Sequence, residues 1–327
     1  MDAVLTWVDG SDPAFRARMA PYLTRQHEDR RTDVAGRARL ISSREIFLAV
    51  ASLLRFAPYI GRIWIVTNGQ DPVLGPFLDR YFPDSRVEVK VIDQSVLFEG
   101  YESCLPVFNS MSVETMLWRI PGLSEDFLYM NDDYFLTAPT TLSDVQGEGG
   151  RSVCYAVERP VAWADFLRKF HPVRDGHRRI SFKDTLANGS KVLGDRKYFH
   201  LSHAPEAMKR SVFARYFAEH PDVMLKNAAH RFRSEGQFNV QNFYYRLALR
   251  EGLAECRSPR GVFIMLRPLR HKRRYMERKL ARIARMPGLK FCCMNSLQDA
   301  REEDARLFWA WVSSLLDIDF TIALQNE

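Results

Sequence analysis

The chain has 327 residues, of which 46% are hydrophobic, 27% charged and 12% aromatic. A chain of this length and composition can bury a sizeable core, which excludes a mainly disordered or low-complexity protein. The formal net charge of +7 indicates an anionic partner, such as a nucleotide, an acidic polymer, an anionic membrane surface or a nucleic acid, and does not choose among them.

The cysteines and the apolar segments indicate the compartment. The five cysteines form neither a CxxC pair nor a regular framework, which favours a reducing environment over a secreted, disulfide-bonded protein. The sequence opens on the strand-like MDAVLTWV, and no segment reaches the roughly 18 apolar residues of a membrane span. We therefore expect a cytoplasmic protein.

The first half of the chain alternates between predicted strands and predicted helices. Near-continuous apolar runs predict buried strands at residues 3–8, 62–68, 87–92 and 126–130. Helical spacing predicts helices at 43–56, with Ser42 or Ser43 as the N-cap, and at 112–118. The charged residues 15–38 are expected to form a mobile helix or loop. This alternation indicates an α/β fold with a parallel sheet and crossover helices.

The second half of the chain is predicted to be more helical. Helices are expected at residues 205–219, 239–249, 274–285 and 301–316. Residues 267–285 carry nine Lys or Arg residues and one acid, Glu277. Read as a helix, this segment is cationic over much of its surface, with a narrow apolar stripe. It is expected to contact an anionic inner membrane or an acidic polymer, although a solvated helix face explains it as well.

The strongest local signal is FLYMNDDYF, a predicted strand that ends in Asp132 and Asp133. Ligands of α/β sheets bind at the carboxyl ends of the strands, and two carboxylates there offer hard oxygen ligands for Mg²⁺ or Mn²⁺. A solvated turn after a strand is the alternative reading. On spacing alone, both readings stay open.

A second candidate is TWVDGSDP, at the end of the first predicted strand. In a nucleotide-binding sheet, Asp9 would accept ribose hydroxyl groups and Gly10 would let the backbone approach a ligand closely. The same residues are good turn formers, so this motif is weak by itself.

Histidine and arginine residues of the second half supply further candidates. His203, in HLSHAPEAM just before a predicted helix, is a sensible base for an acceptor hydroxyl, although most single histidines are structural. Arg231 and Arg233, in HRFRSEGQ, suit bidentate contacts to phosphate oxygens. Their alternative reading is a surface charge run.

Taken together, these segments resemble the Stealth family of phosphotransferases. Four ordered blocks carry the resemblance, and they span residues 3–250: VLTWVDGSDP, RLISSREIFLAVASLLRFAPYIGRIWIVTNGQDP, LPVFNSMSVETMLWRIPGLSEDFLYMNDDYF, and SHAPEAM followed by HRFRSEGQFNVQNFYY. The resemblance implies a GT-A/Rossmann-like, mostly parallel sheet with flanking helices. It also implies a core at 1–250 and a basic helical extension at 251–327 packed on that core.

The resemblance implies a specific reaction. A hexose-1-phosphate, such as an N-acetylhexosamine-1-phosphate, would pass from a UDP-sugar to a hydroxyl of a polysaccharide or lipid-linked glycan with release of UMP, in capsule or exopolysaccharide synthesis. No nucleic acid partner is expected. The alternatives are a metal-dependent glycosyltransferase that releases UDP and a non-enzymatic anion-binding protein. With the cysteine pattern and the basic segment 267–285, we expect a cytoplasmic protein that can lie on the inner face of the plasma membrane.

The resemblance also assigns residues to roles. Asp132 and Asp133 would hold Mg²⁺ or Mn²⁺, His203 would be the base, and Arg39 and Arg233 would stabilise charge on the transferred phosphoryl group. The residues expected to contact the donor or the reacting centre are Asp9, Gly10, Asn68, Asn109 and Glu114. The chain departs from the family pattern at three positions. Members often carry an arginine at the position of Ala51 and an acid at that of Gln237, and some carry a second histidine at that of Glu206.

Overall fold

A computed structural model describes residues 1–23, 44–171, 173–174, 177–178, 181–269 and 271–320 of the chain. Its strands are β1 (Asp2–Thr6), β2 (Arg62–Thr67), β3 (Glu88–Asp93), β4 (Asp126–Asn131), β5 (Tyr134–Leu136), β6 (Ser152–Pro160), β7 (Val173–Arg174), β8 (His177–Arg178), β9 (Lys197–Leu201), β10 (Glu206–Lys209), β11 (Ala254–Arg257), β12 (Phe263–Leu266) and β13 (Phe291–Met294).

The helices are α1 (Pro13–Met19), α3 (Glu45–Phe56), α4 (Gly75–Tyr81), α5 (Gln94–Leu97), α6 (Ser110–Met116), α7 (Leu142–Val145), α8 (Val161–Arg168), α9 (Phe182–Val192), α10 (Arg210–Glu219), α11 (Pro221–Ala228), α12 (Val240–Arg250), α13 (Tyr275–Ile283) and α14 (Glu302–Leu316). Short 3₁₀ turns are η1 (Ala20–Tyr22), η3 (Glu102–Cys104), η4 (Leu117–Arg119), η5 (Glu148–Gly150) and η6 (Leu297–Asp299).

The central sheet has the strand order β10-β4-β1-β2-β3. Strands β3, β2, β1 and β4 run parallel, and β10 joins the edge in the antiparallel direction. The four strands predicted from apolar runs are therefore the four parallel strands. This confirms the α/β fold with a mostly parallel sheet of the GT-A/Rossmann type.

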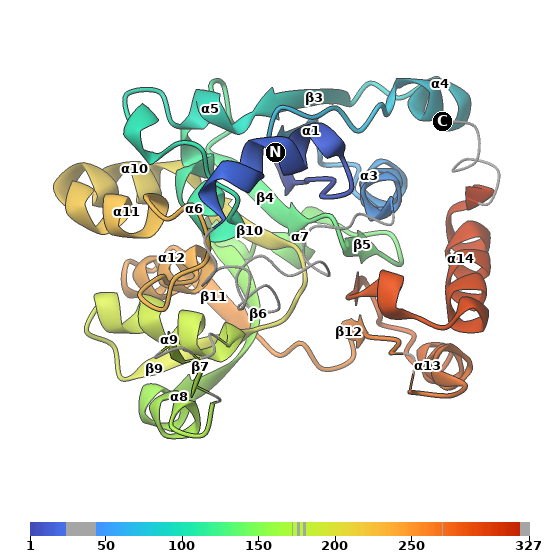
Figure 1. The fold of residues 1–327 in the computed structure, drawn as a ribbon. Helices are drawn as coiled ribbons and strands as arrows, with labels where there is room; N and C mark the ends of the chain where they lie inside the picture. Colours follow the sequence, from blue (N-terminus) through green and yellow to red (C-terminus); the bar gives the residue numbers. More distant parts are fainter. Residues whose placement is uncertain (24–43, 172, 175–176, 179–180, 270, 321–327) are drawn as a thin grey trace.

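The strands β1, β2 and β4 are buried on both faces, which explains why they read as continuous apolar runs, whereas the edge strand β3 is partly exposed. Along β1, Ala3 and Leu5 belong to one hydrophobic cluster and Val4 to the other. The same alternation divides Ile65 from Val66 on β2. Helices α3 and α14 contribute to the first cluster and α6 and α12 to the second, so helices cover both faces of the sheet (Figure 1).

Two three-stranded sheets extend the molecule, and β7 and β8 form a separate two-stranded sheet. One has the order β11-β6-β9, and the other has the order β12-β13-β5. In the second of these, β12 and β13 come from the C-terminal part of the chain, and β13 pairs with β5 in the antiparallel direction. The hydrophobic side of α14 packs into the cluster that also holds α3. The division into a core at 1–250 and an extension at 251–327 stays a prediction.

The predicted helix at 205–219 is wrong in its first turn. Glu206–Lys209 form strand β10 against β4, and α10 begins only at Arg210. The residues of this segment form helices readily, but pairing with the open edge of β4 satisfies their backbone groups, and this tertiary context overrides local propensity. His203 therefore precedes a strand. The candidate caps Ser42 and Ser43 lie outside the described residues.

Within the described residues, no helix combines the length and the apolar character needed to cross a membrane.

The side chain of Ser52 joins α3 to β5 in the core, and this contact leads to a testable prediction. Its hydroxyl donates to Ala49 O at 2.8 Å and accepts from Leu136 N at 3.0 Å. Because Ser52 is fully buried, Ser52→Ala leaves the Leu136 N–H without this partner, and we expect a loss of about 1–3 kcal/mol in the free energy of unfolding. Urea unfolding measures it.

Ser85→Ala is the matched control. The Ser85 hydroxyl accepts from Val87 N at 3.2 Å on the exposed surface, where water can replace it, so a change near zero is expected. Equal losses in the two variants would contradict the role given to Ser52.

Candidate active site

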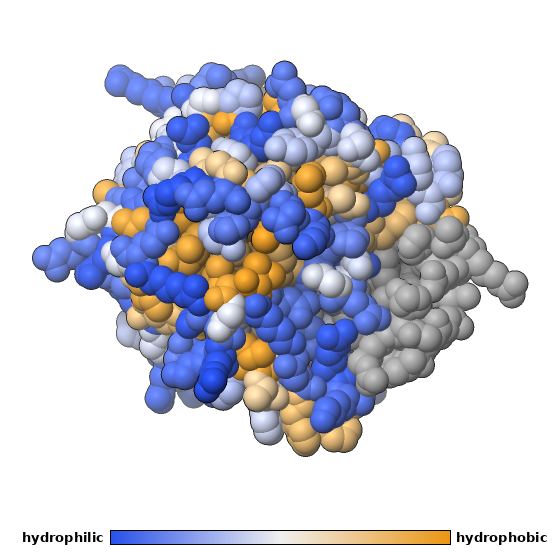
Figure 2. Space-filling view, turned by 90° about the vertical axis from the view of Figure 1, so that its left-hand side faces the viewer, coloured by the Kyte–Doolittle hydropathy of each residue, from blue (hydrophilic) through white to orange (hydrophobic). Residues whose placement is uncertain are grey.

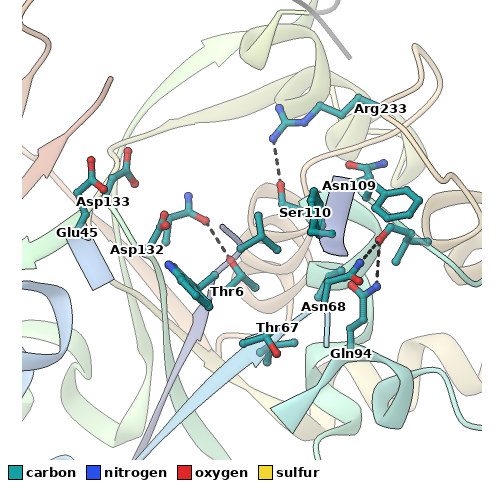
Figure 3. A pocket seen from close by; sticks show the side chains of 18 of the residues that line it. Thr6, Glu45, Thr67, Asn68, Gln94, Asn109, Ser110, Asp132, Asp133 and Arg233 are labelled. Carbon is teal, nitrogen blue, oxygen red and sulfur yellow. Dashed lines mark hydrogen bonds between the residues drawn. The ribbon is translucent and has the colours of Figure 1, made fainter. Parts of the chain in front are cut away.

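A pocket of about 260 Å³ opens at the carboxyl ends of β1, β2 and β4. The three strands are neighbours in parallel register, so the residues that follow each strand meet at one edge of the sheet. Helix N-termini and a loop after β13 complete the walls (Figure 3). The polar lining residues are Thr6, Glu45, Thr67, Asn68, Gln94, Asn109, Ser110, Asn131, Asp132, Asp133, Arg233, Asn295, Ser296 and Gln298.

Three carboxyl groups gather at one end of the pocket (Figure 3). Asp132 and Asp133 follow β4, and Glu45 begins α3. Burial raises the pKa of Asp132 well above its ordinary value, and the neighbouring carboxylates of Asp133 and Glu45 raise it further. A cation at this end would relieve that repulsion.

The end of β13 and the residue after it hold Asp133 in place. Met294 N donates to Asp133 O at 2.9 Å, and the Cys293 thiol donates to Asp133 Oδ2 at 3.4 Å. Burial raises the pKa of Asp133 to about 6, although hydrogen bonds from Cys293 and Asn295 oppose the shift. One of the two predicted metal ligands is therefore positioned by residues of the C-terminal segment.

Arg233 lies at the opposite end of the pocket (Figure 3). Its guanidinium donates to Ser110 Oγ at 3.0 Å. Burial lowers the pKa of Arg233, and the nearby carboxylate of Glu114 opposes this shift. The group stays a cation because an arginine does not deprotonate in a protein. The pocket thus has carboxylates at one end and a fixed positive charge at the other.

The buried amide of Gln237 fixes the loop that carries Arg233. It accepts from Asn109 Nδ2 at 2.7 Å and from Ser234 N at 3.0 Å. It also donates to Ser112 Oγ at 3.1 Å and to Asn227 O at 2.8 Å. All four hydrogen-bonding positions of the amide are used, so Gln237 orients Arg233 against the start of α6.

Amide groups line the side of the pocket next to β2. Asn68 Nδ2 and Gln94 Nε2 donate to Val107 O at 2.9 and 3.0 Å (Figure 3). Arg18 donates to Asn68 O at 2.5 Å. These contacts hold the ends of β2 and α5 together, and they leave polar edges along this wall that suit a ribose or a base.

His203 lies beside the carboxylate end but does not line the pocket. Its Nδ1 is 3.0 Å from the hydroxyl of Tyr134, the residue after Asp133, and its ring centroid is 4.9 Å from that of Phe182. Burial lowers the pKa of His203 to about 4, and the charge of His200 lowers it further. The imidazole is therefore neutral near pH 7.

Other predicted site residues lie around this pocket. The Asp9 carboxylate accepts from Ser11 N and Ser11 Oγ, and Gly10 O accepts from Arg16 Nε, so both residues stabilise the loop after β1. Glu114 is buried behind the pocket. Arg39 lies outside the described residues. The structure brings Asn68, Asn109, Asp132, Asp133 and Arg233 to the pocket wall.

Sequence reasoning missed several residues of this wall. Glu45 lies in one of the four sequence blocks but is not among the predicted site residues, although it faces the two aspartates (Figure 3). Ser110 lies in one of the four sequence blocks but was assigned no role, and Gln94 lies outside them, because the role of each depends on which strands are neighbours. The residues after β13 follow an ordinary apolar strand, and nothing in that stretch indicates a ligand site.

A metal ion fits the carboxylate end only with help from a substrate. Among the described residues, no group of three or more His, Cys, Asp or Glu side chains is arranged to hold a metal ion by itself. Mg²⁺ commonly uses one or two carboxylates and takes its other ligands from water and substrate phosphates. Asp132 and Asp133 meet that requirement.

Solved structures with a similar course of the chain are glycosyltransferases. Mouse xyloside xylosyltransferase 1 in its apo form has a TM-score of 0.41 at 9% identity, covering 90% of this chain and 97% of that one. Galactosyltransferase LgtC, in complex with donor and acceptor sugar analogues, has a TM-score of 0.44 at 10% identity, covering 97% and 95%.

The sequence itself defines the family. Residues 1–26 match Stealth protein CR1, conserved region 1, and residues 39–152 match Stealth protein CR2, conserved region 2. The chain belongs to the Stealth family, as the four sequence blocks predict.

Two similar curated proteins are both named exopolysaccharide phosphotransferases. Exopolysaccharide phosphotransferase SCO6023 of Streptomyces coelicolor is 31% identical over 306 residues, which are 93% of this chain and 48% of that protein. Exopolysaccharide phosphotransferase CpsY of Mycobacterium tuberculosis is 33% identical over 259 residues, which are 78% and 45%. The chain thus spans about half the length of the curated relatives it matches.

The low pKa of His203 predicts a pH dependence of stability. The unfolded histidine, with a pKa near 6.5, binds a proton before the folded one, whose pKa is about 4, so stability falls as the pH drops through this window. When the pH falls from 7.5 to 4.5, the free energy of unfolding should drop by about 2 kcal/mol more in wild type than in His203→Gln. Urea titrations at both pH values measure this difference.

His271→Gln serves as the control, because His271 is exposed and its substitution should leave the pH profile of wild type intact. Parallel pH profiles for wild type and His203→Gln would contradict a buried neutral imidazole.

Proposed function

We propose that the protein transfers a sugar-1-phosphate, such as N-acetylhexosamine-1-phosphate, from a UDP-sugar to a hydroxyl of a glycan, in exopolysaccharide or capsule synthesis. One observation carries the proposal: a single pocket at the carboxyl ends of parallel strands places two aspartates at one end and a fixed arginine at the other. This division suits an activated sugar whose diphosphate needs both a cation site and a guanidinium. The names of the relatives support it.

The donor would lie along the pocket. The amides of Asn68 and Gln94 and the edge of Asn109 would contact the nucleoside, because they form the polar wall beside β2. Arg233 would bind phosphate oxygens, since its guanidinium is held in place by Ser110. Buried and pre-oriented, it would stabilise the charge that develops on the transferred phosphoryl group without having to reorganise.

Asp132 and Asp133 would hold Mg²⁺ or Mn²⁺, which when bound neutralises charge on the diphosphate. Glu45 adds a third negative group to this end, and Cys293 and Met294 keep Asp133 oriented.

His203 would act on the acceptor side. The acceptor oxygen attacks the phosphorus next to the sugar, the bond to the bridging oxygen breaks, UMP leaves with that oxygen, and His203 takes the proton of the acceptor hydroxyl. This role requires the tautomer in which Nδ1–H donates to Tyr134 Oη, because Nε2 then keeps its lone pair. A bound diphosphate would raise the pKa of His203, since an anion favours the imidazolium form.

The decisive prediction concerns the nucleotide product. With Mg²⁺, a glycan acceptor and the correct member of a UDP-sugar panel, the protein should release UMP, and release should require both metal and acceptor. Chromatography resolves UMP from UDP. Release of UDP would identify a conventional glycosyltransferase, because the bond on the sugar side would then have broken.

Substitutions test the assigned residues. Asp133→Asn and His203→Ala should each lower kcat by about 10²–10⁴-fold, since each removes a group that acts on the reacting centre. Circular dichroism and thermal melting should show a folded protein in both cases. The exposed residues Asp84 and His271 give matched controls in Asp84→Asn and His271→Ala. Wild-type turnover in either site variant would remove that residue from the mechanism.

The apolar stripe of the basic segment 267–285 faces the core of the protein. On α13, Tyr275 and Met276 are buried in the core cluster, and Leu280 and Ile283 pack against it. The apolar stripe is thus used inside the protein, and the outward side is cationic. We propose that it holds the protein near an anionic membrane surface by charge alone, without insertion. Its exposed arginines include Arg273, Arg278, Arg282 and Arg285.

Charge-only binding makes a clear prediction. Replacing these four arginines with serine should abolish co-sedimentation with vesicles of phosphatidylcholine and phosphatidylserine at low salt, and added salt should weaken the wild-type binding. A control with the same change of charge replaces Arg80, Arg86, Arg260 and Arg306, which are exposed elsewhere. Equal loss in both variants would show that only net charge matters.

A further inference from the structure

Helix α8 carries three aromatic side chains on the outside of the protein. Trp163 is 53% exposed, Phe166 is 48% exposed, and Phe170, just after the helix, is 71% exposed. Their spacing of three and four residues places them on one face of the helix. Figure 2 shows apolar residues at the bottom of the molecule, at the height of α8 in Figure 1. Large rings are costly to expose, so such a group indicates a binding surface.

The three rings, here called the aromatic ladder, are neighbours in space. Trp163 and Phe166 are stacked with centroids 5.8 Å apart and an interplanar angle of 24°, and Phe166 meets Phe170 edge-on at 5.3 Å. The ladder therefore offers successive ring surfaces on which the apolar faces of successive sugars can lie.

The ladder is joined to the candidate active site on its acceptor side. Helix α8 packs on α9, whose first residue, Phe182, is 37% exposed and lies 4.9 Å from His203 between ring centroids. From the other side of α8, Arg168 donates to Glu235 at 3.0 Å, in the loop that carries Arg233. A chain lying on the ladder could therefore continue past Phe182 to His203.

Positive charge accompanies this path. Arg159 and Lys183 are exposed, one just before α8 and the other at the start of α9. Burial lowers the pKa of His200, and the charges of Lys183 and Arg159 lower it further, which places both cations near the strand that leads to His203. The acidic neighbours Asp165 and Glu158 are already paired with Lys191 and Lys197.

We propose that the aromatic ladder, together with Arg159 and Lys183, binds the growing acceptor chain as an anionic, phosphodiester-containing glycan. The inference rests on the proposed function, because transfer of sugar-1-phosphate units produces a chain in which sugars alternate with negatively charged phosphodiesters. Sugars would stack on the rings, and phosphates would contact the two cations. The ladder would then keep the polymer bound while its end reaches His203.

A glycan fits this surface better than a lipid bilayer does. The ladder is a narrow row of rings that continues towards His203. Its helix, α8, also carries Asp165, which forms an ion pair with Lys191. Insertion into a bilayer would have to bury this pair in the interface, at a cost in desolvation. A bilayer also gives no reason for the path past Phe182.

The test compares binding of a defined glycan by matched variants. The ligand is a synthetic hexamer of N-acetylglucosamine joined through 1-phosphodiesters, and its affinity is measured by isothermal titration calorimetry without donor. The triple variant Trp163→Ala, Phe166→Ala, Phe170→Ala should bind about tenfold more weakly or worse than wild type. Val91→Ala, which removes an apolar side chain that is 44% exposed on β3, should bind as wild type does.

A second comparison tests the charges. Arg159→Gln with Lys183→Gln should weaken hexamer binding and reduce its dependence on salt, since fewer ion contacts are then made. An uncharged chitin hexamer should bind wild type more weakly than the phosphodiester hexamer and should be insensitive to this double change.

Several outcomes would overturn the inference. They are undetectable hexamer binding by wild type, equal binding by the triple variant, and loss of vesicle binding or of self-association in the triple variant while its hexamer binding persists. Because the calorimetry needs no turnover, the two proposals fail separately. Hexamer binding that depends on the ladder, with no UMP release, rejects the reaction alone, and UMP release with ladder-independent binding rejects the ladder alone.

Discussion

The parallel pairing of β1 with β2 and β4 is the constraint on which the site depends. Thr6 lies opposite Val66 on one side and opposite Asn131 on the other. The residues that follow the three strands therefore emerge at one edge. Because both faces of the sheet are covered by helices, these strand ends provide the place where polar side chains gather without disrupting the core.

Residues late in the chain hold side chains of the pocket in place. Strand β13 pairs with β5, directly after Asp133, and its Cys293 and Met294 hold that residue. Arg233 likewise reaches the pocket from a loop late in the chain, held by Gln237. The matched family regions end at residue 152, so the pocket joins them to parts of the chain that lie far beyond them in sequence.

The polarity of the pocket separates two sides of the proposed reaction. Carboxylates at one end and a guanidinium at the other suit a charged diphosphate, and the amide wall suits a nucleoside. His203 stands outside this pocket, behind Tyr134 and next to the exposed ring of Phe182. In the proposed reaction, this arrangement leaves the surface around α8 for the acceptor, on the same side as the imidazole that burial keeps neutral.

The sequence alone determined the four parallel strands, the carboxylates after β4, and the family, because apolar runs and ordered motifs are local properties of the chain. It was wrong about the first turn of 205–219, where pairing of Glu206–Lys209 with the edge of β4 outweighs helix propensity. Only the tertiary structure showed Glu45 facing Asp132, Gln237 fixing Arg233 and Cys293 holding Asp133. Cys293 lies 160 positions from Asp133, and Gln237 fixes the loop of Arg233 through Asn109 and Ser112, which are 128 and 125 positions away. No local pattern records which distant segments become neighbours.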